Sequence, residues 1–160
     1  MYTDYLTSPI GLIEIQASKK GVTKVNFVES ASTPVSTNEV TKRCKKQLQE
    51  YFDSRREIFD LPLDPQGTDF QKSVWSALTK IVFGQTAPYA KIAKMINNPK
   101  AVRAVGAANG RNPVAIIVPC HRIIGSNGSL TGYAGGLDRK AWLLAHEGVP
   151  HPITHLPRSK

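Results

Sequence analysis

Two stretches near the N-terminus carry the hydrophobic pattern of β-strands. Residues 13–17 alternate apolar and polar side chains, the two-residue period of a strand with one buried face. A run rich in β-branched residues follows at 22–28, after a Lys-Lys-Gly turn at 19–21. The pattern predicts a hairpin, followed by a loop over residues 29–38.

An amphipathic helix is predicted next. Val40, Cys44, Leu48 and Tyr51 recur at helical spacing, with basic residues between them. Cys44 lies on the apolar face, so we expect a buried structural thiol. The proline-rich stretch 61–67 then predicts a linker.

The chain after the linker predicts a helix with a marked N-terminus. Thr68 and Gln71 have the spacing of a capping box, and apolar residues continue at helical spacing to Ile81. We therefore expect a helix with an apolar face from Phe70 to Ile81, ended by Gly84-Gln85-Thr86.

A helix-turn-helix pattern follows. Residues 89–96 predict one short helix and residues 100–108 an alanine-rich second one. Between them Asn98 is a plausible cap and Pro99 a plausible first helical residue. Small side chains allow the second helix to approach DNA closely, and Arg103 is the long charged residue in its middle.

The C-terminal third predicts a buried segment and one last helix. The apolar run 114–118 indicates a buried strand or an extended core segment that leads to Cys120. A helix is predicted over 137–147, with Gly148 as its stop. The residues expected on its inward face are Leu137, Ala141, Leu144 and Ala145.

Charge separates the two parts of the chain. The 160 residues carry a net charge of +9, with 21 Lys and Arg against 12 Asp and Glu. Residues 1–67 hold nine of each sign, so all the excess lies in 68–160 and predicts a polyanionic partner. No apolar run reaches the length of a membrane helix, no secretory signal is visible, and two cysteines make no disulfide framework. We expect a cytoplasmic protein with reduced thiols.

Cys120 is the sharpest chemical feature. It follows a proline at the end of the apolar run and precedes His121 and Arg122. A free thiol has a pKa of about 8.5, and positive charge with a histidine base favours the reactive thiolate. Glu147 is the acid best placed to orient His121. A Cys-His-Glu set alone also fits a thiol hydrolase.

Several spaced motifs resemble one protein family, the O6-alkylguanine-DNA alkyltransferases, also called methylated-DNA–protein-cysteine methyltransferases. The active-site signature is carried by Asn112-Pro113 and by 116–122, Ile-Ile-Val-Pro-Cys-His-Arg. The resemblance extends over residues 67–148 through Gly67-Thr68, Phe70-Gln71, Val74-Trp75, 101–106, Asn109, Gly132-Tyr133, 135–137, Lys140, 142–144 and 146–148.

The resemblance implies an α+β fold in two domains. Residues 1–66 would form a small RNase H-like domain. Residues 67–150 would form a helical domain for DNA binding and alkyl transfer, with a winged helix-turn-helix. Residues 151–160 would be a flexible tail.

It also implies a reaction. The Cys120 thiolate would take an alkyl group from O6 of guanine, and from O4 of thymine, while His121 accepts the thiol proton through a water. The thioether product does not hydrolyse, so the protein would act once and need no soluble cofactor. The catalytic residues that the resemblance implies are Cys120, His121, Glu147, Asn112, Tyr89 and Lys140.

The implied partner is double-stranded DNA containing O6-alkylguanine, bound in the minor groove after the base is flipped out. The protein would act as a monomer that can cluster cooperatively on DNA, associated with the nucleoid. The implied DNA-binding residues are Arg103, Ala101, Ala104, Gly106, Ala107, Asn109, Arg111 and Arg122. The implied substrate-pocket residues are Val118, Tyr133, Ala134, Gly135, Ala115 and Trp75.

Three other functions compete with this one. A non-catalytic lesion-binding relative would lack the reactive cysteine, which is present at Cys120. A sequence-reading regulator needs more long polar side chains than the second helix offers. A thiol hydrolase explains neither the helix-turn-helix nor the charge. A metal site at His146, His151 and His155 is disfavoured because prolines interrupt that segment, and we expect none.

Overall fold

The computed structural model describes residues 1–126, 128, 130 and 132–149, so the tail expected at 151–160 lies outside the described residues. The chain divides into two compact units. The first comprises Met1–Gln66 together with Pro113–Ile117, and the second comprises Gly67–Asn112 and the residues from Val118 onward. The mixed content of strands and helices confirms the α+β class. Within the described part of the chain, no helix is long and apolar enough to cross a membrane.

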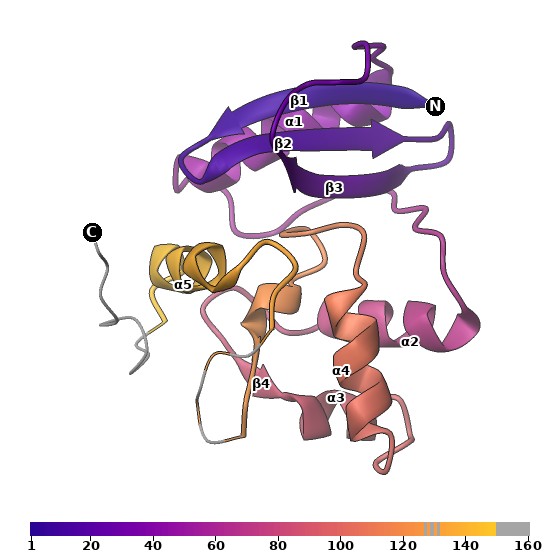
Figure 1. The fold of residues 1–160 in the computed structure, drawn as a ribbon, viewed down its shortest axis with the longest axis vertical. Coiled ribbons are helices and arrows are strands. Elements are labelled where there is room, and N and C mark those ends of the chain that lie inside the picture. Colours follow the sequence, from indigo (N-terminus) through magenta and orange to yellow (C-terminus); the bar gives the residue numbers. More distant parts are fainter. Residues whose placement is uncertain (127, 129, 131, 150–160) are drawn as a thin grey trace. The chain divides into compact units, whose positions relative to one another are not determined.

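The first unit is built on a three-stranded antiparallel sheet (Figure 1). Its strands, in sheet order, are β1 (Tyr2–Ser8), β2 (Gly11–Ala17) and β3 (Val22–Val28). The predicted strands at 13–17 and 22–28 are confirmed. Strand β1 was not predicted, because its buried side chains include Thr3 and Tyr5, which obscure the alternation of apolar and polar residues.

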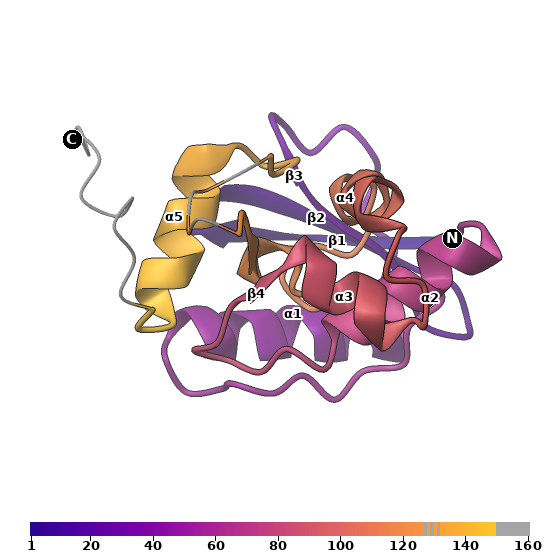
Figure 2. The same cartoon turned by 90° about the horizontal axis from the view of Figure 1, so that it is seen from below.

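Helix α1 (Glu39–Phe52) covers one face of this sheet (Figure 2). It begins with a capping box in which the Asn38 side chain accepts from the amide of Thr41. Cys44, Leu48 and Tyr51 are buried, as the helical spacing predicts. The predicted burial of Cys44 is confirmed, and burial raises the pKa of its thiol to about 12.

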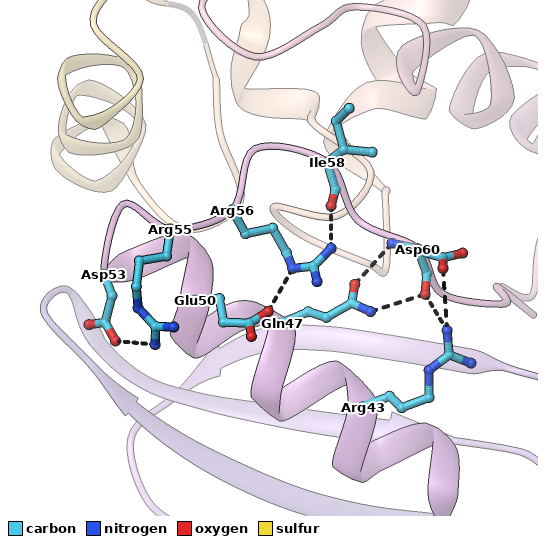
Figure 3. A network of polar contacts seen from close by, with 8 residues as sticks. All are labelled: Arg43, Gln47, Glu50, Asp53, Arg55, Arg56, Ile58 and Asp60. Carbon is cyan, nitrogen blue, oxygen red and sulfur yellow. Dashed lines mark hydrogen bonds and ion pairs between the residues drawn. The ribbon is translucent and has the colours of Figure 1, made fainter.

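A polar network fastens the loop after α1 back onto the helix (Figure 3). The Gln47 amide donates to the carbonyl oxygen of Asp60 at 3.1 Å and accepts from its backbone N–H at 2.9 Å. Arg56 bonds the carboxylate of Glu50 at 2.8 Å and the carbonyl oxygen of Ile58 at 2.7 Å. The loop backbone is therefore held by side chains.

The segment 113–117 joins the first unit although it lies far along the chain. The amide of Val25 donates to Pro113 O at 2.9 Å, and the amide of Ala115 donates to Val25 O at 2.9 Å. Of the two alternatives predicted for 114–118, the buried core segment is the one that forms. Strand pairing is limited to a single bridge at Val114, because Ile116 has a φ of 72° and turns the chain. Left-handed backbone is an outlier for a β-branched residue.

The second unit is mainly helical. Its elements are α2 (Asp69–Leu78), β4 (Ala87–Pro88), α3 (Tyr89–Met95), α4 (Val102–Gly110), a 3₁₀ turn (Cys120–Arg122), β5 (Ile123–Ile124) and α5 (Leu137–His146). The Thr68–Gln71 capping box is confirmed. Helix α2 ends at Leu78, before the stop predicted at Gly84-Gln85-Thr86, and Ile81 is buried in the turn that follows. The short β4–β5 pair was not predicted.

Helix α4 begins later than predicted. Asn97 has a φ of 60°, and the amide of Ala101 bonds the carbonyl oxygen of Asn98 at 3.0 Å. Pro99 therefore belongs to the turn, and Val102 is the first helical residue. The expected cap at Asn98 is wrong, since Ala101 occupies that position and offers no capping side chain.

Helix α5 faces inward differently from the prediction. Leu137 is 47% exposed and Ala145 is exposed, whereas Lys140, Leu143 and Leu144 are buried. Helical periodicity predicts that a lysine faces solvent, whereas Lys140 is buried. The predicted stop is confirmed, because Gly148 follows the helix with a φ of 77°.

Candidate active site and nucleic-acid interface

Cys120 opens a 3₁₀ turn in the second unit. Its backbone N–H bonds the carbonyl oxygen of Val118 at 2.8 Å, and only 5% of the residue is exposed. The side-chain amide of Asn112 donates to the same carbonyl at 2.8 Å. The backbone N–H of Cys120 and the side chain of Asn112 thus both bind the Val118 carbonyl oxygen, and they fix the chain just before the thiol.

The environment of the Cys120 thiol has opposing effects. Burial raises the pKa of Cys120, whereas a hydrogen bond with Asn112 and the charge of Lys140 lower it. The resting group is therefore a thiol, and the two polar neighbours stabilise the thiolate when a proton acceptor removes the proton.

His121, the residue that follows Cys120, forms a buried pair with Glu147. His121 Nε2 lies 2.7 Å from Glu147 Oε2, and neither side chain is exposed. Burial lowers the pKa of His121 against the raising effect of Glu147, so the imidazole is neutral. Burial alone would raise the pKa of Glu147, but bonds with His121 and Arg122 hold it well below its usual range. His121 Nδ1 is buried and has no hydrogen-bond partner among the described residues.

Arg122 corrects one sequence expectation. It was expected to bind DNA, but the residue is 6% exposed and its guanidinium lies inside the unit. Nε donates to Glu147 Oε1 at 2.8 Å and Nη2 donates to Glu147 Oε2 at 3.0 Å. Nη1 donates to the carbonyl oxygen of Ile81 at 2.7 Å, and the Phe83 ring centroid lies 5.9 Å from Cζ.

Lys140 and Tyr133 bring two more buried polar groups close to Cys120. Lys140 Nζ donates to the carbonyl oxygen of Ile123 at 2.5 Å, and burial lowers its pKa to about 8. Burial raises the pKa of Tyr133 well above its usual value, and the nearby Cys120 adds to the shift. Across the part of the chain that the structure describes, the Tyr133 hydroxyl has no hydrogen-bond partner.

The helix-turn-helix carries the remaining expected groups. Tyr89 begins α3, and its ring lies against Gly106 of α4, where an added Cβ would be 3.8 Å from ring carbon Cε1. Gly106 lies one turn after Arg103, so the phenol and the guanidinium arise from neighbouring positions on the α3–α4 pair. Of the predicted DNA-binding residues in this region, Arg103, Ala104, Ala107 and Arg111 are exposed, and Ala101 and Gly106 are half-buried.

Two expected site residues have a structural place instead. Asn109, expected on DNA, is 2% exposed and turned inward at the end of α4. Trp75, expected in the substrate pocket, is 3% exposed, and its indole N–H donates to the carbonyl oxygen of Ala108 at 2.8 Å. It ties α2 to α4, because a buried indole N–H needs an acceptor.

The other residues expected in the substrate pocket differ in their burial and in the unit to which they belong. Val118 is buried and presents its carbonyl oxygen to the reactive turn, while Ala134 is exposed. The Gly135 carbonyl oxygen accepts from Arg139 at 3.1 Å. Ala115 belongs to segment 113–117 of the first unit, and its place in the pocket wall stays a prediction.

Sequence reasoning missed the groups that anchor Arg122, namely the carbonyl oxygen of Ile81 and the Phe83 ring. One signal in the sequence was charge. Residues 68–160 hold three acidic and twelve basic residues, and this excess of bases favours a basic partner for Glu147. Among the described residues, no three His, Cys, Asp or Glu side chains gather as metal ligands. His151 and His155, at which no metal site is expected, lie outside the described residues.

Comparison with known proteins assigns both units to one family. The family model of the 6-O-methylguanine DNA methyltransferase ribonuclease-like domain matches residues 1–65. The family model of the 6-O-methylguanine DNA methyltransferase DNA binding domain matches residues 69–149.

Individual relatives agree. A methylated-DNA–protein-cysteine methyltransferase from Methanosarcina acetivorans is 51% identical over 154 residues, covering 92% of this chain and 99% of the relative. The crystal structure of Mycobacterium tuberculosis O6-methylguanine methyltransferase is 41% identical with a TM-score of 0.83, covering 96% of this chain and 97% of that one. The crystal structure of Mycobacterium tuberculosis OGT in complex with DNA is 43% identical with a TM-score of 0.84, covering 92% of each chain. Two matching domains in the expected order, and relatives similar over nearly their whole length, show that this chain belongs to the 6-O-methylguanine DNA methyltransferase family.

Proposed function

We propose that this chain repairs DNA by moving an alkyl group from O6 of guanine, or from O4 of thymine, to the sulfur of Cys120. The observation that carries the proposal is the buried Cys120 thiol, followed by the neutral His121 paired with Glu147. Burial raises the pKa of the thiol, and the bond with Asn112 favours the thiolate once the proton has left. Membership of the methyltransferase family supports the same activity.

The displacement needs one proton acceptor and one proton donor. The Cys120 proton passes through a water to Nδ1 of His121, while Glu147 holds the opposite nitrogen. Sulfur attacks the alkyl carbon, the S–C bond forms, and the C–O6 bond breaks. Tyr89 gives a proton to the departing guanine, which otherwise leaves as a poorer anionic leaving group.

The exposed face of α4 supplies the contact with DNA. Small residues there allow close approach to the minor groove, and the exposed Arg103 fills the space left by the flipped base. Flipping costs a few kcal/mol, and less for a weakly paired damaged base. The chain works as a monomer on double-stranded DNA in the nucleoid, and several copies can cluster along one duplex.

The product explains why each molecule acts once. A thioether on Cys120 does not hydrolyse, and Cys44 is buried in the other unit with its pKa raised to about 12, so it regenerates nothing. After complete reaction, a second addition of substrate should bring no further repair.

The test is intact mass and peptide mapping after incubation with a duplex that carries O6-methylguanine. We expect a gain of about 14 Da on Cys120, the mass of a methylene group, as expected for covalent transfer to a nucleophile. Cys120→Ala should show no gain. Tight binding of the duplex by the unaltered chain without a mass change would overturn the proposal in favour of the non-catalytic alternative.

A further inference from the structure

We propose that Arg122 is a positioning residue of the transfer site, which clamps the carboxylate of Glu147 and through it fixes the orientation and proton of His121. This inference rests on the proposed function, because it assigns a role in the same reaction. It replaces the DNA contact that the family resemblance implied for Arg122.

The clamp has two parallel bonds. Arg122 Nε and Nη2 reach Oε1 and Oε2 of Glu147 at 2.8 and 3.0 Å, the fork geometry in which arginine grips a carboxylate. Glu147 Oε2 also lies 2.7 Å from His121 Nε2. One carboxylate oxygen therefore joins the guanidinium to the imidazole, and rotation of the carboxylate would break both contacts.

The guanidinium is itself anchored on its other side. Nη1 donates to the carbonyl oxygen of Ile81 at 2.7 Å, and the Phe83 ring lies 5.9 Å away. These groups follow α2, while Glu147 follows α5. With 6% of the residue exposed, Arg122 is committed to bonds inside the unit and presents no cation to a DNA phosphate.

The clamp sets which nitrogen of His121 accepts a proton. The bond with Arg122 keeps Glu147 ionised, and an ionised carboxylate only accepts hydrogen bonds. Nε2 must therefore carry the imidazole proton, which leaves Nδ1 as the basic nitrogen. Nδ1 is the buried atom without a partner among the described residues, so it is the nitrogen available to a water that relays the Cys120 proton.

The charges around His121 give the inference a pH signature. Glu147 raises the pKa of His121, while Arg122 and Lys140 lower it, as does burial. Cys120 precedes His121 in the turn, and the Tyr133 phenol is close enough to respond to Glu147. Loss of the Arg122 charge should therefore raise the pKa of His121 and move the acid limb of the transfer rate to higher pH.

The experiment compares Arg122→Gln and Arg122→Lys with the unaltered chain. Lys72→Gln, an exposed position on α2, is the control for loss of one positive charge. Two quantities are measured for each: affinity for an undamaged duplex at several salt concentrations, and the first-order transfer rate with O6-methylguanine duplex at saturating protein.

A positioning role predicts that Arg122→Gln binds the undamaged duplex within twofold of the unaltered chain but transfers at least tenfold more slowly. Arg122→Lys should keep the acid limb near its original pH and still lose rate, because one ammonium replaces a fork. The opposite pattern would overturn the inference: full rate at saturation in both variants, with weaker binding and a salt slope reduced by about 0.9 in Arg122→Gln, the signature of a lost phosphate contact.

An NMR titration of the His121 imidazole separates this inference from the proposed function. The pKa of His121 should rise in Arg122→Gln and remain unchanged in Lys72→Gln, whether or not transfer occurs. An unaltered chain that takes no methyl group would defeat the proposed function alone. An unmoved His121 pKa in a folded Arg122→Gln would defeat the clamp alone, and Arg122→Lys provides the rate comparison if the glutamine variant does not fold.

Discussion

The side chain of Asn112 is bonded to the backbone of Val118, with Nδ2 donating to the carbonyl oxygen at 2.8 Å. The bond spans the five residues 113–117, which pack in the first unit. It fixes the point at which the chain returns to the second unit, directly before Cys120.

Replacing Asn112 should therefore affect both stability and reactivity. Asn112→Ala removes the donor to Val118 and the bond that lowers the pKa of Cys120. We expect a loss of about 1–3 kcal/mol in the free energy of unfolding and about tenfold less thiolate for each unit by which the pKa rises. Urea unfolding and pH-dependent alkylation of Cys120 measure the two effects. Asn112→Asp, nearly the same size, should show the same loss; an unchanged thiol would contradict this account.

Stability should fall in mild acid because of His121. Its folded pKa is depressed below the ordinary value of 6.5. Below pH 6.5 the unfolded chain therefore binds a proton that the folded chain does not, and the free energy of unfolding falls as pH falls. Glu147, whose folded pKa is also depressed, adds a second loss below its ordinary 4.5.

The measurement is urea unfolding from pH 4 to 8 for the unaltered chain and His121→Asn. The stability advantage of the unaltered chain should shrink as pH falls below 6.5. If the difference in free energy of unfolding between the two chains stays constant across this range, the pKa of His121 is not depressed in the folded chain.

Lys140 should make the stability of the protein depend on pH in the alkaline range. Its pKa falls from 10.5 in the unfolded chain to about 8 in the folded one. Between these values the unfolded chain holds more protons, so the stability of the unaltered chain relative to Lys140→Met should rise by about 3 kcal/mol. Thermal unfolding from pH 7.5 to 10.5 measures the difference. The same variant should transfer more slowly, because the charge of Lys140 lowers the Cys120 pKa.

Gln47 should protect the loop after α1 from proteolysis. Gln47→Ala removes the acceptor of the Asp60 backbone N–H and one of the two donors to its carbonyl oxygen, which keeps Arg43 at 2.6 Å. We expect a cost of about 0.5–1.5 kcal/mol. Release of the loop should speed trypsin cleavage after Arg55 and Arg56. Lys46→Ala, exposed on the same helix, is the control and should cleave at the original rate. Equal cleavage in both variants would mean that the network does not hold the loop.

Two glycines should respond to alanine with opposite signs. A Cβ on Gly21 would lie 2.6 Å from the carbonyl oxygen of Pro62. This oxygen belongs to the backbone, which cannot shift as easily as the end of a flexible side chain. We expect Gly21→Ala to cost about 1–3 kcal/mol. Gly110, in α4 with no atom within 4 Å of the added carbon, should gain about 0.5–1 kcal/mol. Thermal unfolding of the two variants decides, and a stable Gly21→Ala would contradict the observed packing.

Local patterns predicted the parts of the fold that local physics determines. The alternation at 13–17, the helical spacing from Val40 to Tyr51 and the Thr68–Gln71 capping box each report neighbouring residues only, and each element formed as predicted. The start of α4 was misplaced because the φ of Asn97 is set by the turn as a whole. Tyr2–Ser8 was missed because a partner strand, more than its own pattern, makes it a strand.

The site shows the same division. The motif order indicated Cys120, His121 and Glu147, and the structure brings the last two into contact. The resemblance implied a DNA contact for Arg122, and its internal partners correct that expectation. Those partners are a carbonyl oxygen 41 positions earlier and a carboxylate 25 positions later, separations that no sequence window covers.

Segment 113–117 has a consequence for synthesis of the protein. The first unit takes nearly all its residues from the first 66, yet both backbone groups of Val25 wait for partners that the ribosome adds much later. A nascent chain stopped after the linker holds a sheet whose third strand still exposes those groups. The N-terminal unit is therefore complete only once the second half of the gene has been translated through Ile117, and a chain cut at residue 66 lacks a piece of the domain that it encodes.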